Sequence, residues 1–260
     1  MTTIELRDVS KTFKDAKRKT DVTALSNVDI TVKRNDFLCL LGPSGCGKST
    51  LLNMIAGFDK PSTGTVTVDG QAVVSPGADR GVVFQQANLM PWLPVWENVA
   101  FHLKLRGAQK AERRDRAQIY IDKVGLRGFE NHYPCELSGG MNQRVGIARA
   151  LLMNPRVILM DEPFGALDEQ TRMDMQAELV RIWQEQKGTI VFVTHGIDEA
   201  LTLGTHVAVM SARPGRIAEL IPLDLPRPRD ITSPQFNDVK RHILDLLRPG
   251  ASSSRAEPPS

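Results

Sequence analysis

The sequence lacks any apolar run close to the roughly 18 residues that a membrane-spanning helix needs. Its start, MTTIELRDVS, lacks the basic, apolar and small-residue order of a signal peptide. It has only three cysteines, Cys39, Cys46 and Cys135, at spacings that fit neither a zinc site nor a disulfide framework. We therefore interpret the cysteines as packing residues and predict a cytoplasmic protein.

The chain also lacks a strong excess of either charge, since its formal net charge is +3 over 260 residues. That value is too small to indicate a nucleic-acid partner, and we expect none. The basic stretch Lys110 to Arg116 also contains Glu112 and Asp115, which is typical of a solvated helix face. With 41% hydrophobic residues, the chain can bury a core of its own.

Three short segments near the start alternate apolar and polar residues and are separated by turn residues such as Asp69-Gly70. The segments are Ile4 to Val9, Val28 to Val32 and Val66 to Val68. Their period of two predicts a small antiparallel sheet. Residues 88–154 instead show mostly helical patterns, as in Arg113 to Val124 and Gln143 to Met153, which favours a separate helical lobe.

Three further segments are continuously apolar, the pattern of strands covered on both faces of a parallel sheet. They are Phe37 to Leu41, Val157 to Met160 and Ile190 to Val193. Ligands of open parallel sheets bind beyond the carboxyl ends of the strands, so we expect the site along that edge. The segments that follow the strands are Gly42 to Thr50, Asp161-Glu162 and Thr194-His195.

The first of these segments, GPSGCGKST, fits the phosphate-loop pattern G-x-x-x-x-G-K-[ST] through Gly42, Gly47, Lys48 and Ser49. A buried strand precedes it and a helical pattern, Ser49 to Ala56, follows it, as the pattern requires. Backbone amides and the helix N-terminus would hold phosphates, Lys48 would reach the β and γ oxygens, and Ser49 would ligate Mg²⁺. A structural glycine-rich turn is the weaker interpretation.

Two further segments carry suitable chemistry. Asp161 would hold Mg²⁺ through water, and Glu162 would position or deprotonate an attacking water. Ser138-Gly139-Gly140 precedes a helix with apolar residues at helical spacing, so its free amides and helix dipole predict a second anion site. Taken alone, the first pair could be a helix cap and the second segment an ordinary helix start.

The chain resembles the ATP-binding subunits of ABC transporters between about Ile4 and Arg229. The motifs that carry the resemblance are GPSGCGKST, VVFQQ with Gln85, LSGGMNQRVGIARAL, RVILMDEP, GALD ending at Asp168, and VTH ending at His195. The resemblance implies an α/β fold with a RecA-like P-loop NTPase core, an N-terminal antiparallel β-subdomain and an inserted α-helical subdomain. It implies a single ATPase domain over 1–248, with the core and β-subdomain at 1–87 and 155–235, the helical signature subdomain at 88–154, a C-terminal helix at 236–248 and a disordered tail at 249–260.

The resemblance also implies the roles of single residues. Phe13 stacks on adenine, unless it packs in the core; Gln85 senses Mg²⁺ and water; His195 contacts the γ-phosphate and the attacking water. Asp168 crosses the interface of a head-to-tail dimer in which each ATP lies between the phosphate loop of one copy and Leu137 to Met141 of the other. The implied catalytic residues are Lys48, Gln85, Glu162 and His195, and the implied metal ligands are Ser49, Gln85 and Asp161. The implied ATP contacts are Phe13, Gly42, Pro43, Ser44, Gly45, Cys46, Gly47, Lys48, Ser49, Thr50, Gln85, Ser138, Gly139, Gly140 and Asp168.

Several stretches, among them LMPW (Leu89 to Trp92) and RPGRI, are similar to the nitrate, sulfonate and taurine importer branch. This similarity implies uptake of a small anion through a membrane permease fed by a solute-binding protein, with the chain on the cytoplasmic face of the membrane. Leu89, Met90, Trp92 and Trp96 would dock on the permease or, for about half of them, pack the helical lobe. Arg213-Pro214-Gly215-Arg216 is interpreted as a structural turn.

Three other functions stay open at this point. An ABC exporter subunit would share the whole ATP site. A soluble ABC ATPase acting on DNA or the ribosome is disfavoured, because the chain has no sustained heptads, no paired cysteines and a single nucleotide cassette. A phosphate-loop kinase is weaker still. Three places depart from the family pattern: Asn35-Asp36 stands where Gly-Glu is more familiar, Asn142 where a basic residue is frequent, and Gly196 where Asp is usual.

Overall fold

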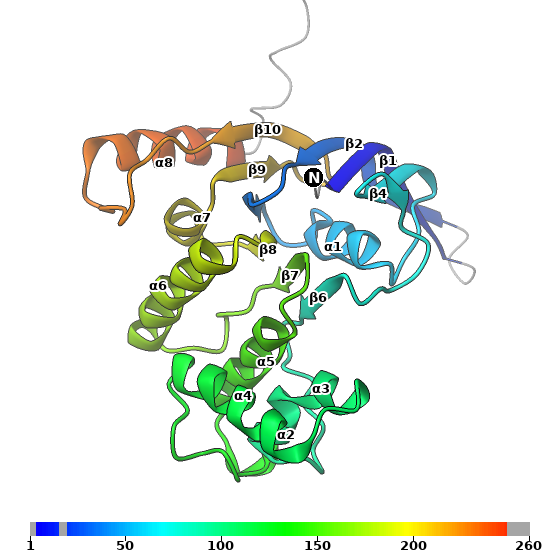
Figure 1. The fold of residues 1–260 in the computed structure, drawn as a ribbon. Helices are drawn as coiled ribbons and strands as arrows, with labels where there is room; N and C mark the ends of the chain where they lie inside the picture. Colours follow the sequence, from blue (N-terminus) through cyan, green and yellow to red (C-terminus); the bar gives the residue numbers. More distant parts are fainter. Residues whose placement is uncertain (1–3, 16–19, 249–260) are drawn as a thin grey trace, which may run out of the picture. The chain divides into compact units, whose positions relative to one another are not determined.

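The computed structural model describes residues 4–15 and 20–248, which fall into two compact units. Unit 1 comprises residues 1–76 and 191–260, and unit 2 comprises residues 77–190; the colour bar of Figure 1 locates these ranges. We describe each unit by itself. Within the described ranges, no helix has the length and apolar character needed to cross a membrane. The predicted tail at 249–260 lies outside the described residues.

The first sheet of unit 1 is antiparallel, as predicted, with strand order β2-β1-β4-β5. Its strands are β1 (Ile4–Asp15), β2 (Thr20–Val32), β4 (Thr63–Val68) and β5 (Gln71–Ala72). Leu6 and Val9 are both buried although they are three residues apart, because the register shifts between them and Asp8 adopts a positive φ of 49°. This bulge returns Val9 to the core face.

The second sheet of unit 1 supplies the expected buried strand. Its elements are β3 (Phe37–Leu41), β9 (His206–Met210), β10 (Ile217–Pro222) and the 191–194 part of β8 (Thr189–Thr194). Strand β3 is parallel to β9, while β10 is antiparallel to β9. All five residues of β3 are buried, and the rings of Phe37 and Phe192 lie 5.9 Å apart. The helices of the unit are α1 (Lys48–Ala56), α7 (Ile197–Leu203) and α8 (Pro234–Leu247).

Unit 2 combines two parallel strands with a group of helices, drawn in green to yellow in Figure 1. The strands are β6 (Arg80–Val83) and β7 (Val157–Asp161). The helices are α2 (Val95–Val99), α3 (Phe101–Leu105), α4 (Lys110–Lys123), the 3-10 turn η1 (Pro134–Glu136), α5 (Gly139–Met153) and α6 (Glu169–Gln186). Helix α5 is the centre of the packing, since it contacts α2, α3, α4 and β6.

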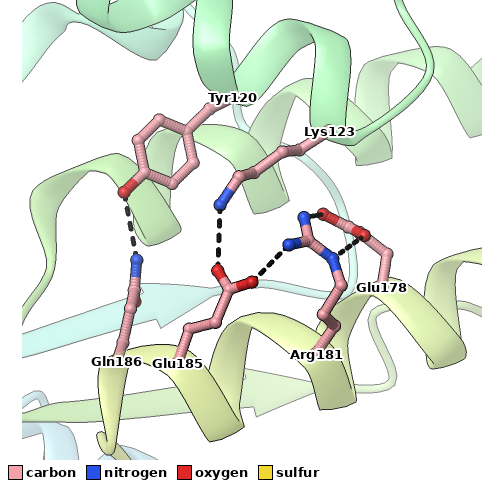
Figure 2. A network of polar contacts seen from close by, with 6 residues as sticks. All are labelled: Tyr120, Lys123, Glu178, Arg181, Glu185 and Gln186. Atoms are coloured by element: carbon pink, nitrogen blue, oxygen red, sulfur yellow. Dashed lines mark hydrogen bonds and ion pairs between the residues drawn. The ribbon is translucent and has the colours of Figure 1, made fainter.

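A network of polar contacts joins α4 to α6 (Figure 2). The Gln186 amide donates to the Tyr120 hydroxyl at 3.0 Å, and Lys123 lies 3.5 Å from a carboxylate oxygen of Glu185. Arg181 joins the network through its ion pairs with Glu178 and Glu185. Exposed ion pairs contribute little stability one by one, so we interpret the network as fixing the orientation of the two helices.

Two expectations about single side chains need correction. Cys39 and Cys46 are buried as expected, but Cys135 is exposed, because it lies in the turn η1, which has no buried residue. The basic stretch at the start of α4 is not only a solvated face. Lys110 and Arg113 lie within 6 Å of the Trp96 ring, at 5.9 and 5.7 Å from its centroid, and so cover an aromatic side chain that is 4% exposed.

Candidate nucleotide site

The phosphate loop leaves β3 at Gly42 and enters α1 at Lys48. Gly45 and Gly47 have positive φ angles of 75° and 99°, which glycine adopts without strain. A Cβ atom at Gly47 would lie 2.5 Å from Leu25 Cδ2, and one at Gly42 would lie 2.8 Å from Cys46 Sγ. The loop is therefore compact because its glycines bring backbone close to neighbouring side chains.

The Lys48 ammonium group is buried inside this loop. Its Nζ donates to the carbonyl oxygens of Gly42 at 2.8 Å and Pro43 at 3.1 Å, and the residue is only 6% exposed. Among residues 4–15 and 20–248, no carboxylate forms an ion pair with it. Its other contact is with Cys46 Sγ at 3.9 Å, so the buried cation is held by uncharged groups, which favours the approach of an anion.

The N-terminus of α1 is prepared for the same kind of ligand. Its N-cap Gly47 makes no side-chain cap hydrogen bond, and the first turn has no acidic residue. Ser44, Gly45 and Ser49 are exposed along the loop and the first turn of the helix. Cys46 is buried beneath them, and burial raises the pKa of its thiol, so this cysteine stays neutral beside Lys48. The loop thus offers amides and hydroxyls to solvent.

Two further predicted residues belong to unit 1. His195 is exposed directly after β8, and Thr194 before it is buried. The Thr194 hydroxyl donates to Glu199 and accepts from the Gly196 amide at 2.9 Å, which fixes the backbone on both sides of His195. Phe13 on β1 is 46% exposed, so its alternative role as a core residue is wrong. The Lys11 ammonium lies 5.0 Å from the centroid of the Phe13 ring.

The carboxylates of unit 2 lie at the end of β7. Asp161 is its last residue, and Glu162 follows with a positive φ of 44°. Residues other than glycine occupy this left-handed region rarely, and many that do are found at functional sites. Because β6 runs parallel to β7, with Val83 opposite Met160, Gln85 leaves the same edge of the sheet. The structure therefore brings Gln85 to the edge that carries Asp161 and Glu162.

The Ser138-Gly139-Gly140 segment starts α5. The Ser138 hydroxyl caps the helix by accepting from the Met141 amide at 3.2 Å, and the first turn holds no acidic residue. Ser138 and Gly139 are exposed, and a Cβ atom at Gly139 would meet nothing within 4 Å. At Gly140 a Cβ atom would lie 3.1 Å from the carbonyl oxygen of Ala166, in the GALD turn. The segment presents an open surface on one side and packs closely on the other.

Asp168 closes the GALD turn and begins the next helix. Its carboxylate accepts from the Thr171 amide at 2.9 Å as the N-cap of α6. The hydrogen bond from Thr171 holds the pKa of Asp168 below its usual value. This cap leaves the remainder of the exposed carboxylate facing solvent.

Comparison with known proteins decides the family. A family profile described as "ABC transporter" matches residues 25–165, more than half of the chain. The chain belongs to the ABC transporter family. The predicted α/β P-loop NTPase fold and ATPase class are thereby confirmed.

Two curated ABC relatives and one solved structure illustrate the similarity. The chain is 47% identical to a nitrate import ATP-binding protein of Synechocystis over 94% of this chain and 95% of the relative. It is 50% identical to a taurine import ATP-binding protein of Rhizobium johnstonii over 92% and 95%. A dimeric ATP-binding cassette bound to ADP and Pi has a TM-score of 0.77 and 38% identity, covering 85% of this chain and 98% of that one.

Two residues of this ABC subunit that no motif argument singled out hold the segment around Gln85. The Gln143 side chain, 2% exposed, donates to the Phe84 carbonyl at 2.9 Å, and Arg149 donates to the Ala87 carbonyl at 2.9 Å. Burial lowers the pKa of Arg149. Both residues lie on α5, so hydrogen bonds join the signature helix directly to the segment around Gln85. The sequence signal is that both are polar residues on a helix most of whose buried positions are apolar.

Two of the departures from the family pattern, Asn142 and Gly196, lie at helix starts. The Asn142 side chain donates to the Pro134 carbonyl at 3.0 Å and so ties the start of α5 to η1. Gly196 starts α7, and a Cβ atom there would meet only ordinary contacts, the nearest being Glu199 Cβ at 3.4 Å. Neither position needs its unusual residue for packing, and neither removes a predicted site residue.

The four predicted docking residues differ in exposure, with Leu89 and Met90 half-buried. Trp96 is buried and Trp92 is 72% exposed. The segment from Met90 to Leu93, which contains Trp92, is held by buried Asn98, whose amide donates to the carbonyls of Met90 at 3.1 Å and Leu93 at 2.8 Å. The structure therefore presents Trp92 on a defined backbone rather than on a loose loop.

Proposed function

We propose that this ABC ATPase is the ATP-hydrolysing subunit of an importer for a small anion of the nitrate or sulfonate type. The observation that carries the ATPase part is the phosphate loop. There a buried ammonium, with no carboxylate partner in the described part of the chain, lies beneath an uncapped helix N-terminus. Such a loop binds phosphates through amides, helix dipole and lysine together. The import part is supported by relatives named for nitrate and taurine import, of which taurine carries a sulfonate.

Each predicted residue receives the role that its chemistry fits. Residues 42–50 bind the phosphates of ATP, and the exposed ring of Phe13 stacks on adenine. Glu162 accepts a proton from the attacking water, which Gln85 and His195 orient, while Lys48 neutralises charge on the β and γ oxygens. These assignments are carried over from the family pattern onto the matching positions of this chain.

Mg²⁺ fits the donors that the chain offers. Mg²⁺ prefers oxygen ligands and keeps several waters, with one or two protein groups and substrate phosphates completing its shell. Among the described residues, no group of three or more His, Cys, Asp or Glu could hold a metal, so a fully protein-made site is not expected there. Of the ligands that the family pattern implies, unit 1 would supply the Ser49 hydroxyl, and unit 2 would supply the Asp161 carboxylate and the Gln85 side chain. When bound, Mg²⁺ neutralises the charge on the phosphates.

Gly139 supports a head-to-tail dimer. Neither its φ angle nor its packing requires glycine, since it has no positive φ and a Cβ atom would meet nothing within 4 Å. Glycine in a helix is less favourable than alanine by about 1 kcal/mol, so glycine here has a cost without a gain inside the chain. We assign the open space to a nucleotide that the phosphate loop of a second copy holds, with Ser138, Gly140 and Asp168 flanking it.

The remaining partners follow from the importer assignment. A membrane permease takes the docking contact, with the exposed Trp92 as its anchor on unit 2. A solute-binding protein delivers the anion to that permease, so the solute never contacts this subunit. The chain then works on the cytoplasmic face of the membrane.

Glu162→Gln tests the mechanism. The amide cannot accept a proton from water, so we expect the ATPase rate to fall by about 10²- to 10⁴-fold while ATP binding persists. With saturating ATP and Mg²⁺ the variant should accumulate as a closed dimer, measured by size-exclusion chromatography with light scattering. Glu112→Gln, on the exposed start of α4, is the matched control and should behave as wild type. A Glu162→Gln protein that stays monomeric with bound ATP would contradict the dimer.

Copurification tests the importer assignment separately. A tagged chain extracted with its membrane should bring down a permease, and the solute-binding protein encoded with it should bind nitrate or an alkanesulfonate. Export of the same anion from right-side-out vesicles would contradict import and leave the ATPase assignment intact.

A further inference from the structure

The turn Arg213-Pro214-Gly215-Arg216, between β9 and β10, packs directly against the phosphate loop. The Arg213 Nε donates to the carbonyl oxygen of Gly45 at 3.0 Å. A Cβ atom at Gly215 would lie 1.8 Å from the Cys46 carbonyl oxygen, so only glycine fits beneath the loop. The turn is more than a connection between strands.

The sheet explains how two distant segments meet. Strand β3 precedes the loop and β9 precedes the turn, and the two strands are parallel, with Leu41 opposite Val209. Both segments therefore leave at the same edge of the sheet. A Cβ atom at Gly42 would lie 2.9 Å from the Met210 carbonyl oxygen. The phosphate loop and the chain after β9 are therefore already close where they leave the sheet.

The turn is itself anchored. The Gly215 amide donates to the Ala24 carbonyl at 2.9 Å, and the Ser26 amide donates to the Gly215 carbonyl at 3.0 Å, which ties the turn to β2. The Ser211 amide donates to the Arg216 carbonyl at 2.9 Å and closes the turn. Arg213 is thus presented from a fixed backbone, although its own side chain is exposed.

The contact constrains a peptide group that a phosphate would use. In the trans peptide between Gly45 and Cys46, the carbonyl and the N–H point in opposite directions. Arg213 holds the carbonyl and thereby sets the direction of the Cys46 N–H. This N–H donates to the Pro43 carbonyl at 3.3 Å, a long hydrogen bond that a phosphate oxygen can replace.

Gly45 is the residue that most needs such a constraint. Its φ of 75° lies in the region that glycine enters freely, so its conformation is not fixed by its own backbone. Ordering a loose loop upon binding lowers affinity, whereas a loop ordered beforehand avoids that cost.

We propose that Arg213 is a positioning residue of the phosphate loop, which orders the Gly45-Cys46 peptide for the phosphates of the nucleotide without touching the nucleotide itself. This role rests on the proposed function. The guanidinium acts as a hydrogen-bond donor to Gly45, and its positive charge is secondary.

Two substitutions separate the donor from the charge. In Arg213→Gln the side-chain amide nitrogen occupies the same place along the side chain as Arg Nε, and in Arg213→Met a methyl group does. Both lose the charge, but only Gln keeps the donor. Affinity for MgADP, measured by titration calorimetry on the full chain, should fall about three- to ten-fold in Arg213→Met, as for a lost hydrogen bond, and Arg213→Gln should recover most of it.

Arg216→Met is the matched control. Arg216 lies on the same turn and is exposed, but its guanidinium donates to the Ser26 hydroxyl at 3.4 Å rather than to the loop. The Arg216→Met variant should therefore bind MgADP with the affinity of wild type. Without nucleotide, all three variants should melt within about 2 °C of wild type, because surface substitutions change stability little.

Each other result overturns the role. Equal losses in Arg213→Met and Arg213→Gln would assign the effect to charge, and an equal loss in Arg216→Met would assign it to the turn as a whole. A melting temperature clearly below that of wild type in both Arg213 variants would assign the lost affinity to impaired folding. If Arg213→Met bound MgADP like wild type, Arg213 would have no role in the loop. A wild-type chain that binds no MgADP would instead overturn the proposed function.

Discussion

The two glycine-rich segments of the molecule use glycine for opposite reasons. In the phosphate loop of unit 1, a Cβ atom at Gly42 or Gly47 would lie 2.8 or 2.5 Å from another atom of the same chain. In the signature segment of unit 2, a Cβ atom at Gly139 would meet nothing within 4 Å. The chain closes around the glycines of the first segment, whereas in the second segment it packs closely only on Gly140 and leaves open space at Gly139.

The two segments are also held differently. The phosphate loop is held by backbone carbonyls around Lys48 and by a neighbouring turn, whereas the signature segment is held by the Ser138 cap and by polar side chains such as Gln143. Contacts within one chain explain the sequence of the phosphate loop. They do not explain Gly139, and this is why we propose that its role involves atoms from outside the chain.

Gly47→Ala should give the largest effect on stability. The new Cβ atom must adopt a φ of 99° and displace Leu25, and strain of this kind costs about 1–3 kcal/mol of the free energy of unfolding. Nucleotide binding should be lost as well. Urea unfolding followed by circular dichroism measures the stability. Gly70→Ala is the matched control, because Gly70 has a φ of 75° and open space. Equal losses in both variants would show that packing against Leu25 does not limit the loop.

Gly139→Ala should leave stability alone and remove activity. The helix start gains a better helix former, so the free energy of unfolding should stay within about 1 kcal/mol of wild type or rise slightly. The ATPase rate at saturating ATP should nevertheless fall strongly, because a methyl group fills space that the nucleotide on the second copy needs. Gly188→Ala, with equally open surroundings, should keep both stability and activity. Full ATPase activity in Gly139→Ala would contradict the role of the open space.

The features that could be predicted from the sequence are those set by residues close together along the chain. The phosphate loop, β3, β7 and the antiparallel sheet follow from motifs and hydrophobic patterns within a few residues, and the structure confirms the elements. The contact of Arg213 with Gly45 joins residues 168 positions apart, and no local pattern reports such a pairing. The contact of Gln143 with the Gln85 loop has the same character. The roles of Phe13, Gln85, His195 and Asp168 on the nucleotide stay predictions from the family pattern, because they concern atoms of ATP or of a second chain.

The caps of the two helix starts in unit 2 give the smallest and most discriminating test. Ser138 caps α5 with a hydroxyl, and Asp168 caps α6 with a carboxylate whose pKa is lowered by its hydrogen bond from Thr171. A carboxylate with a depressed pKa in the folded state stabilises it fully above the pKa of the unfolded chain, and this contribution is lost as the pH falls through the folded value.

Asp168→Asn keeps a capping oxygen and removes the charge, so it should be slightly less stable than wild type at pH 7. That difference should shrink between pH of about 5 and about 3, as the wild-type carboxylate takes up its proton. Urea unfolding at both pH values measures it. Ser138→Ala removes a capping hydroxyl that does not titrate, so its loss of unfolding free energy should be the same at both pH values. If the loss of unfolding free energy in Asp168→Asn did not change with pH, the charge of Asp168 would contribute nothing to its contact with Thr171. Both helix starts would then be stabilised by cap hydrogen bonds alone.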